Sequence, residues 1–141
     1  MRDEAWDGDI PAQIDLCLRA RITLLILYTT EEERAIRILQ DVCGRFQPSR
    51  PLIMWDLVDG FSGVKDTPPR AVNIRDPLQA LDELEKTDDS AAVVLKDFHE
   101  FWTNPAVKRK MRNLAQKFRF SRRTMIVVTP SLKVPEEIRD N

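Results

Sequence analysis

Residues 24–34 read LLILYTTEEER, an apolar run that ends in two threonines and three consecutive glutamates. An apolar run followed at once by a helix-start signal predicts a buried strand that turns directly into a helix. Thr30 and Glu33 have the spacing of a capping box, in which each side chain bonds the backbone N–H of the other residue. We therefore expect a self-capped helix over residues 31–46, with negative charge at its N-terminus.

This turn differs in chemistry from a phosphate-binding loop. Such a loop uses glycines, whose backbone N–H groups wrap the phosphates, and a lysine that reaches their outer oxygens. Residues 28–34 contain neither glycine nor lysine, and three glutamates would repel a polyphosphate. The sequence therefore argues against nucleotide binding at this turn. If a cofactor did bind here, Thr29 and Thr30 would be the residues of the turn that contact it.

Length and composition indicate one ordinary domain. The chain has 141 residues and 43% hydrophobic content, enough to fill a single core, so we expect one domain over residues 1–141. No window approaches the ~18 apolar residues of a membrane helix, and the N-terminus has no signal-peptide layout, which predicts a cytoplasmic protein without membrane insertion. Cys17 and Cys43 lie in helical patterns among apolar neighbours, and we expect reduced core thiols rather than a disulfide or metal pair.

The formal net charge of −1 hides a strong segregation of charge along the chain. Residues 1–100 hold 12 Lys and Arg against 20 Asp and Glu, whereas residues 101–135 hold 9 basic and no acidic residues. A basic stretch of this kind predicts an electropositive surface that meets an acidic partner, a nucleic acid or the acidic face of another copy.

Apolar runs alternate with helical patterns along the sequence. We expect helices over residues 11–19 and 31–46, and further helices that begin at Asp76-Pro77, Asn104-Pro105 and Glu136. We expect strands over residues 22–29, 52–57, 91–95 and 124–129. Residues 58–70 concentrate glycine and proline and are expected to form a loop. This alternation predicts a three-layer, doubly wound α/β fold with a mainly parallel sheet and helices on both faces.

Ligand sites in doubly wound folds lie at the carboxyl ends of the strands. The candidate cation ligands there are Asp56, Asp59 and Asp97, because magnesium prefers carboxylate oxygens. Asp56 and Asp59 are equally well explained as turn residues. His99 lies between Asp97 and Glu100, which suggests an acid–base or metal role, but no second histidine exists to complete a metal site. We therefore favour a structural or docking role for His99.

The helix that begins at residue 104 has two contrasting faces. Val107, Met111, Leu114 and Phe118 form an apolar stripe that predicts one buried face. The opposite face, the candidate interaction surface, carries Lys108, Arg109, Lys110, Arg112, Lys117 and Arg119. Protein or self-association is the favoured role of this surface, ahead of a merely solvated face. Nucleic-acid binding, with Trp102 or Phe120 for stacking, is less favoured because the whole protein is not basic.

Three passages carry a resemblance to a known family: residues 19–34 (RARITLLILYTTEEER), 95–99 (LKDFH) and 123–130 (RTMIVVTP). They resemble the N-terminal region of the AAA ATPase family known as a hypothetical open reading frame of plastids and cyanobacteria, over nearly the whole chain from about Ile14 onward. The resemblance implies a degenerate P-loop-like domain that precedes a genuine ATPase module. Asp97 would stand in the place of a Walker B acid, and Thr129 in that of a polar sensor.

The same resemblance implies that the chain is a piece of a longer AAA ATPase, an expectation that also follows because the chain ends inside the helix predicted from Glu136. ATP and magnesium would be cofactors of the parent protein, and none is implied for this chain. The family's role implies a link to regulation of photosynthesis and inorganic carbon use.

Two classes of function follow from the sequence. The first is a non-catalytic interaction or assembly domain of an AAA ATPase, which contacts a protein partner or another copy through the basic helix and the loop over residues 59–69. The second is a stand-alone ligand-binding or signalling module that holds a cation with Asp56, Asp59 and Asp97.

Overall fold

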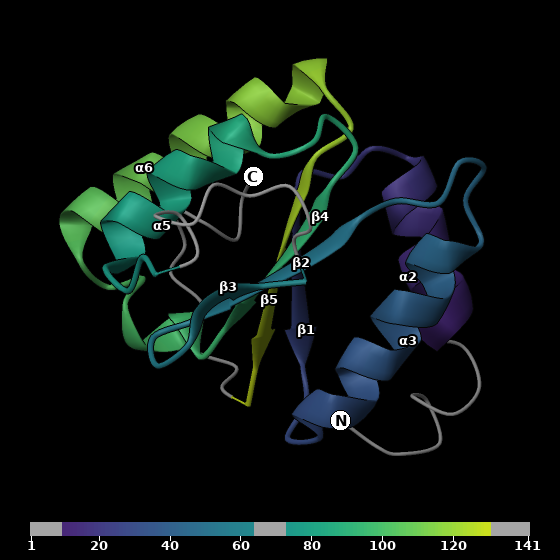
Figure 1. The fold of residues 1–141 in the computed structure, drawn as a ribbon, viewed down its shortest axis with the longest axis horizontal. Coiled ribbons are helices and arrows are strands. Elements are labelled where there is room, and N and C mark those ends of the chain that lie inside the picture. Colours follow the sequence, from purple (N-terminus) through teal and green to yellow (C-terminus); the bar gives the residue numbers. More distant parts are fainter. Residues whose placement is uncertain (1–9, 64–72, 131–141) are drawn as a thin grey trace.

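The computed structural model describes residues 10–63 and 73–130 of the chain (Figure 1). The helices are α2 (Ile10–Arg19), α3 (Glu32–Gly44), α5 (Pro77–Glu83) and α6 (Pro105–Lys117), with short 3-10 turns η1 (Leu84–Lys86), η2 (Phe98–Glu100) and η3 (Phe118–Phe120). The strands are β1 (Leu24–Tyr28), β2 (Leu52–Asp56), β3 (Gly60–Ser62), β4 (Ala92–Lys96) and β5 (Thr124–Thr129). The helix predicted from Glu136 lies outside the described residues, within which no helix is long and apolar enough to cross a membrane.

The five strands form one sheet in the order β1-β5-β4-β2-β3. Neighbouring strands are parallel except β3, which pairs antiparallel with β2. Strand β5 lies between β1 and β4, so the last described strand completes the middle of the sheet. The prediction of a mainly parallel α/β sheet is confirmed, and the fold is consistent with a P-loop-like domain.

Strand β3 corrects the prediction of a continuous loop over residues 58–70. The chain reverses after Asp56, whose Oδ1 accepts hydrogen bonds from the backbone N–H groups of Val58 at 2.8 Å and Asp59 at 2.7 Å. Gly60 then has a φ of 72°, a conformation that glycine adopts without strain. The tight turn brings residues 60–62 back alongside β2. The predicted loop from residue 64 to residue 70 lies outside the described residues.

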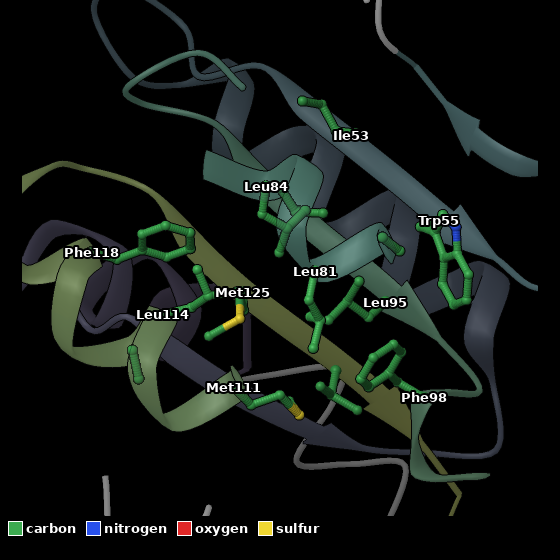
Figure 2. Packing of buried hydrophobic residues seen from close by; sticks show 14 of the residues in the cluster. Ile53, Trp55, Leu81, Leu84, Leu95, Phe98, Met111, Leu114, Phe118 and Met125 are labelled. Atoms are coloured by element: carbon green, nitrogen blue, oxygen red, sulfur yellow. The ribbon is translucent and has the colours of Figure 1, made fainter. Parts of the chain in front are cut away.

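Helices cover both faces of the sheet, which confirms the predicted three layers (Figure 1). Helices α2 and α3 pack on one face, where Ile14, Leu18 and Leu39 meet sheet residues such as Val94 and Ile126. Helices α5 and α6 cover the other face through a larger cluster that contains two of the chain's tryptophans. Figure 2 shows Leu81, Met111 and Leu114 against the side chains of β4 and β5.

The start signals of α5 and α6 work as the sequence predicts. Asp76 accepts a hydrogen bond from the backbone N–H of Gln79 at 3.0 Å, and Asn104 accepts from Ala106 N at 2.9 Å and from Val107 N at 3.3 Å. A proline follows each of these caps, where its missing N–H costs nothing.

The prediction of a capping box at α3 is wrong. The cap residue is Glu31 rather than Thr30, and no side chain caps this helix. The helix starts one residue later than predicted because the hydroxyl of Thr29 accepts the backbone N–H of Glu31 at 2.9 Å and holds the turn in place. Glu33 is then the second helical residue, too early in the helix to reach back to the cap.

The two cysteines are free thiols in different environments. Cys43 is buried on α3, and burial raises the pKa of its thiol. Cys17 on α2 is only half-buried, so the prediction of a core position holds for Cys43 alone.

Arg50 ties together the amino ends of β4 and β5. It is only 7% exposed, and its Nε donates to the carbonyl oxygen of Ser90 at 2.7 Å. One of its terminal nitrogens donates to the carbonyl oxygen of Arg122 and lies 3.3 Å from the hydroxyl of Thr124. The guanidinium therefore joins two loops that are distant in sequence.

Candidate functional site

The carboxyl ends of β1, β5 and β4 bring the predicted cofactor residues to one edge of the sheet. Thr29 follows β1 and Thr129 ends β5, and the backbone N–H of Thr29 donates to the carbonyl of Thr129 at 2.9 Å. Both threonines are buried, whereas Thr30 is exposed. Asp97 follows β4 with a positive φ of 55°. The structure thus places these residues on one edge and uses the Thr29 hydroxyl to fix the strand-to-helix turn.

The predicted cation ligands lie at the same edge, toward β2. Asp56 is engaged by the two backbone N–H groups of the β2–β3 turn, which matches its interpretation as a turn residue. Within residues 10–63 and 73–130, no three His, Cys, Asp or Glu side chains are grouped to hold a metal ion. His99 is 17% exposed, and its Nε2 lies 3.3 Å from Glu100 Oε2, while its Nδ1 is buried without a hydrogen-bond partner.

The apolar stripe of α6 is buried as predicted, and its basic face is divided into two parts. Lys110 Nζ lies 2.9 Å from Asp82 Oδ1 and 4.0 Å from Glu85 Oε2. Lys117 Nζ lies 2.7 Å from Glu85 Oε1, and this hydrogen bond lowers the pKa of the Glu85 carboxyl. These two lysines therefore hold α6 against the α5–η1 segment.

The other cations of the candidate surface face a different environment. Arg109 and Arg119 are exposed, whereas Lys108 and Arg112 are half-buried. The Nε of Arg112 is buried and has no hydrogen-bond partner among the described residues. The sequence pattern missed this division because the carboxylates that pair with the lysines come from different elements, 25 to 32 residues earlier in the chain. The sequence signal that could have predicted these ion pairs is the surplus of negative charge in residues 82–85.

Comparison with known proteins identifies relatives of this chain. Residues 10–141 match the family model of the SpoVK-like AAA ATPase, N-terminal domain. The chain is 33% identical over 128 residues to the uncharacterized AAA domain-containing protein ycf46 of Guillardia theta, an alignment that covers 89% of this chain and 25% of the relative. It is 29% identical over 130 residues to the ycf46 protein of Trieres chinensis, covering 91% of this chain and 26% of that protein.

These matches agree with the resemblance carried by residues 19–34, 95–99 and 123–130. The chain spans about a quarter of the length of the relatives it matches. The family model covers all the described helices and strands, including the turn after β1 and the whole of α6. The chain belongs to the SpoVK-like AAA ATPase N-terminal domain family.

Proposed function

We propose that this chain is a non-catalytic interaction and assembly domain of an AAA ATPase. The turn after β1 carries this proposal: it has neither glycine nor lysine, and its Thr29 hydroxyl and Glu31 N–H are bonded to each other. A nucleotide would find neither the loop nor the cation that phosphate binding requires. ATP and magnesium are accordingly proposed as cofactors of the parent protein and not of this chain.

The working surface in this proposal is the exposed face of α6. Its buried stripe anchors the helix to the sheet, and Lys110 and Lys117 bond to carboxylates of the same chain. Arg109 is exposed at the start of the helix and forms no ion pair with a described residue. Such a cation is able to pair with an acidic protein surface, which steers association and sets orientation. The link to photosynthesis and inorganic carbon use and the cytoplasmic location remain predictions.

The first test of the proposal is calorimetric titration of this chain with ATP and magnesium. The expected result is no heat of binding from this chain, beside clear binding by the longer protein that contains the ATPase module. Tight binding of ATP by the isolated chain would show that the three glutamates are no barrier, and would overturn the assignment of nucleotide binding to the parent protein alone.

The second test concerns the α6 surface. Labelled chain is titrated with the remaining part of the parent protein in the presence of ATP and magnesium, and fluorescence anisotropy reports binding. The double variant Lys108→Glu with Arg109→Glu is expected to bind at least about tenfold more weakly. The control Arg37→Glu with Arg45→Glu changes charge equally across the sheet, on α3 and just after its end, and is expected to bind as the unmodified chain does. If the α6 variant binds as tightly as the control variant and the unmodified chain, the role of α6 is refuted.

The rival proposal, a stand-alone cation-binding module, makes the opposite prediction. It requires Asp56, Asp59 and Asp97 to bind magnesium or calcium without any partner. Asp56 already accepts two backbone hydrogen bonds, which favours the assembly role. Cation binding to this chain that is lost on Asp97→Asn would support the rival.

A further inference from the structure

The loops at the amino ends of β1, β4 and β5 surround a hollow of about 360 Å³. The residues that line it are Arg21 from the loop before β1, Asp89 and Ser90 from the loop before β4, Phe120 at the end of η3, and Ser121 and Arg122 from the loop before β5. Phe120 is 93% exposed, although burial of a phenyl ring away from water is energetically favourable. The hollow is therefore lined by two arginines, two serines, one aspartate and an exposed phenylalanine.

The backbone around this hollow is held by hydrogen bonds. Arg122 N donates to Asp89 O at 2.9 Å, which joins the loops before β5 and β4. Arg50 donates to the carbonyl of Arg122 from beneath. Arg21 N donates to Leu18 O at 3.2 Å and fixes the end of α2. The hollow is thus formed from loops that the structure ties to one another.

The charge at this edge of the sheet is mainly positive. Of the residues that the structure describes, Asp89 is the carboxylate that lines the hollow, and it lies 3.4 Å from Arg123. Asp88, in the same loop, accepts hydrogen bonds from the backbone N–H and the hydroxyl of Ser90. Among the described residues, Arg21 and Arg122 form no ion pair. Burial lowers the pKa of Arg50, the nearby Cys43 thiol partly offsets this effect, and the cation of Arg122 adds a smaller lowering. The hollow therefore favours an occupant that brings carboxylates.

The opposite edge of the sheet has the complementary chemistry. Glu31, Glu32 and Glu33 stand at the start of α3, at the carboxyl end of β1. Glu31 lies 3.4 Å from Arg34, while Glu32 and Glu33 form no ion pair with any described residue. The other carboxylates at this edge are Asp56, Asp59, Asp97 and Glu100. The cations there include Lys96 at the end of β4 and Arg75, whose Nε donates to the carbonyl oxygen of Val58 at 2.7 Å.

The parallel strands keep these two surfaces apart within one molecule. Strands β1, β5 and β4 run in the same direction, so all their amino ends lie at one edge and all their carboxyl ends at the other. The arginines of one molecule therefore do not reach its own glutamates across the length of the strands. Two copies stacked along the strand direction would bring the arginine edge of one against the glutamate edge of the next.

We propose that the hollow formed by Arg21, Phe120 and Arg122 receives the Glu31–Glu33 segment of a second copy of this chain, head to tail. The inference rests on the proposed assembly function and adds to it by naming the two surfaces that meet. The contact covers the Phe120 ring and pairs the guanidinium groups with the carboxylates of Glu32 and Glu33. Because the two surfaces differ, each added copy leaves one of each surface open, so the contact builds a ring or a longer array.

The test is sedimentation velocity of this chain over a range of concentrations at low salt. The unmodified chain is expected to self-associate, and more weakly at higher salt. The hollow variant, Arg21→Glu with Arg122→Glu, and the acidic-turn variant, Glu32→Arg with Glu33→Arg, are each expected to associate at least about tenfold more weakly. Circular dichroism and tryptophan fluorescence check that both variants are folded, and Arg21→Gln with Arg122→Gln replaces the hollow variant if it is not.

The decisive step is to mix the two variants. The hollow variant keeps its native glutamates and the acidic-turn variant keeps its native hollow, so one native contact forms between them and association returns. Failure of the mixture to associate would overturn the inference, as would a chain that stays monomeric at about 1 mM. If the chain does not self-associate but the Lys108→Glu, Arg109→Glu variant loses binding to the remaining part of the parent protein, the proposed function stands and this inference fails. If the hollow instead binds a single-stranded oligonucleotide while the chain stays monomeric, the occupant is not a second copy.

Discussion

Replacement of Arg50 by methionine is the sharpest test of how the amino edge of the sheet is stabilised. Its two shortest hydrogen bonds go to carbonyl oxygens of Ser90 and Arg122, and charge-assisted bonds of this kind contribute about 1.5–3 kcal/mol each. Burial of the guanidinium, which lowers the pKa of Arg50, offsets part of this gain. Methionine has a similar length but donates no hydrogen bond, so both carbonyls lose their partner.

We expect Arg50→Met to lower the free energy of unfolding by about 3 kcal/mol, a large fraction of the ~5–15 kcal/mol typical of a domain. With a urea dependence of about 2 kcal/mol per molar, the unfolding midpoint falls by about 1.5 M. Trp55 and Trp102 are buried, and their fluorescence reports the transition.

The matched control is Arg45→Met, five residues earlier in the sequence. Arg45 pairs with Asp41 on the surface of α3, with a side chain that is 55% exposed, and such pairs contribute about 0–1 kcal/mol. A midpoint for Arg50→Met within about 0.3 M of the unmodified chain, at an unchanged slope, would refute the reasoning. It would mean that water replaces the guanidinium at both carbonyls without loss.

Three further predictions follow from local geometry. Gly63→Ala is expected to cost about 1–3 kcal/mol in urea unfolding, because φ is 78° and the new Cβ would lie 2.8 Å from a strand carbonyl oxygen; Gly44→Ala, with open space around it, is expected to stabilise slightly. A thiol reagent at pH 8 is expected to label Cys17 in the native chain and Cys43 only after unfolding; equal rates would contradict the burial of Cys43. The pKa of Glu85 is lowered in the folded chain, so its stabilisation is present above the unfolded value near 4.5 and is lost as pH falls through the folded pKa. In Glu85→Gln, the free energy of unfolding should therefore fall less between about pH 5 and 3 than it does in the unmodified chain, by less than about 1 kcal/mol.

The elements that could be predicted from sequence are those with a strong period or a specific local signal. The apolar residues of α6 repeat with the helical period, and Asp76 and Asn104 are followed by proline, so these starts were predicted correctly. The fully apolar stretch of β4 predicted a strand buried on both faces. In each case the information lies within about ten neighbouring residues.

The features that were not predicted depend on a choice between similar local hydrogen bonds or on contacts between distant segments. The capping box is a case of the first kind: the hydroxyl of Thr29 accepts the N–H of Glu31, and the helix then starts one residue later than predicted. Strand β3 is three residues long and is formed by pairing with β2, which leaves little pattern in its own sequence. The hollow at the amino edge draws its residues from three loops and could not be recognised before the strand order was known.

The position of β5 between β1 and β4 also has a consequence for synthesis of the chain. Leu24 pairs with Met125, so the first strand of the described fold finds its only described neighbour about a hundred residues later. On a ribosome, β1 therefore has no described strand to pair with until residues 124–129 are made, although α3 can already pack against α2. The nascent chain needs protection from aggregation for several seconds, at the usual ~5–20 residues per second.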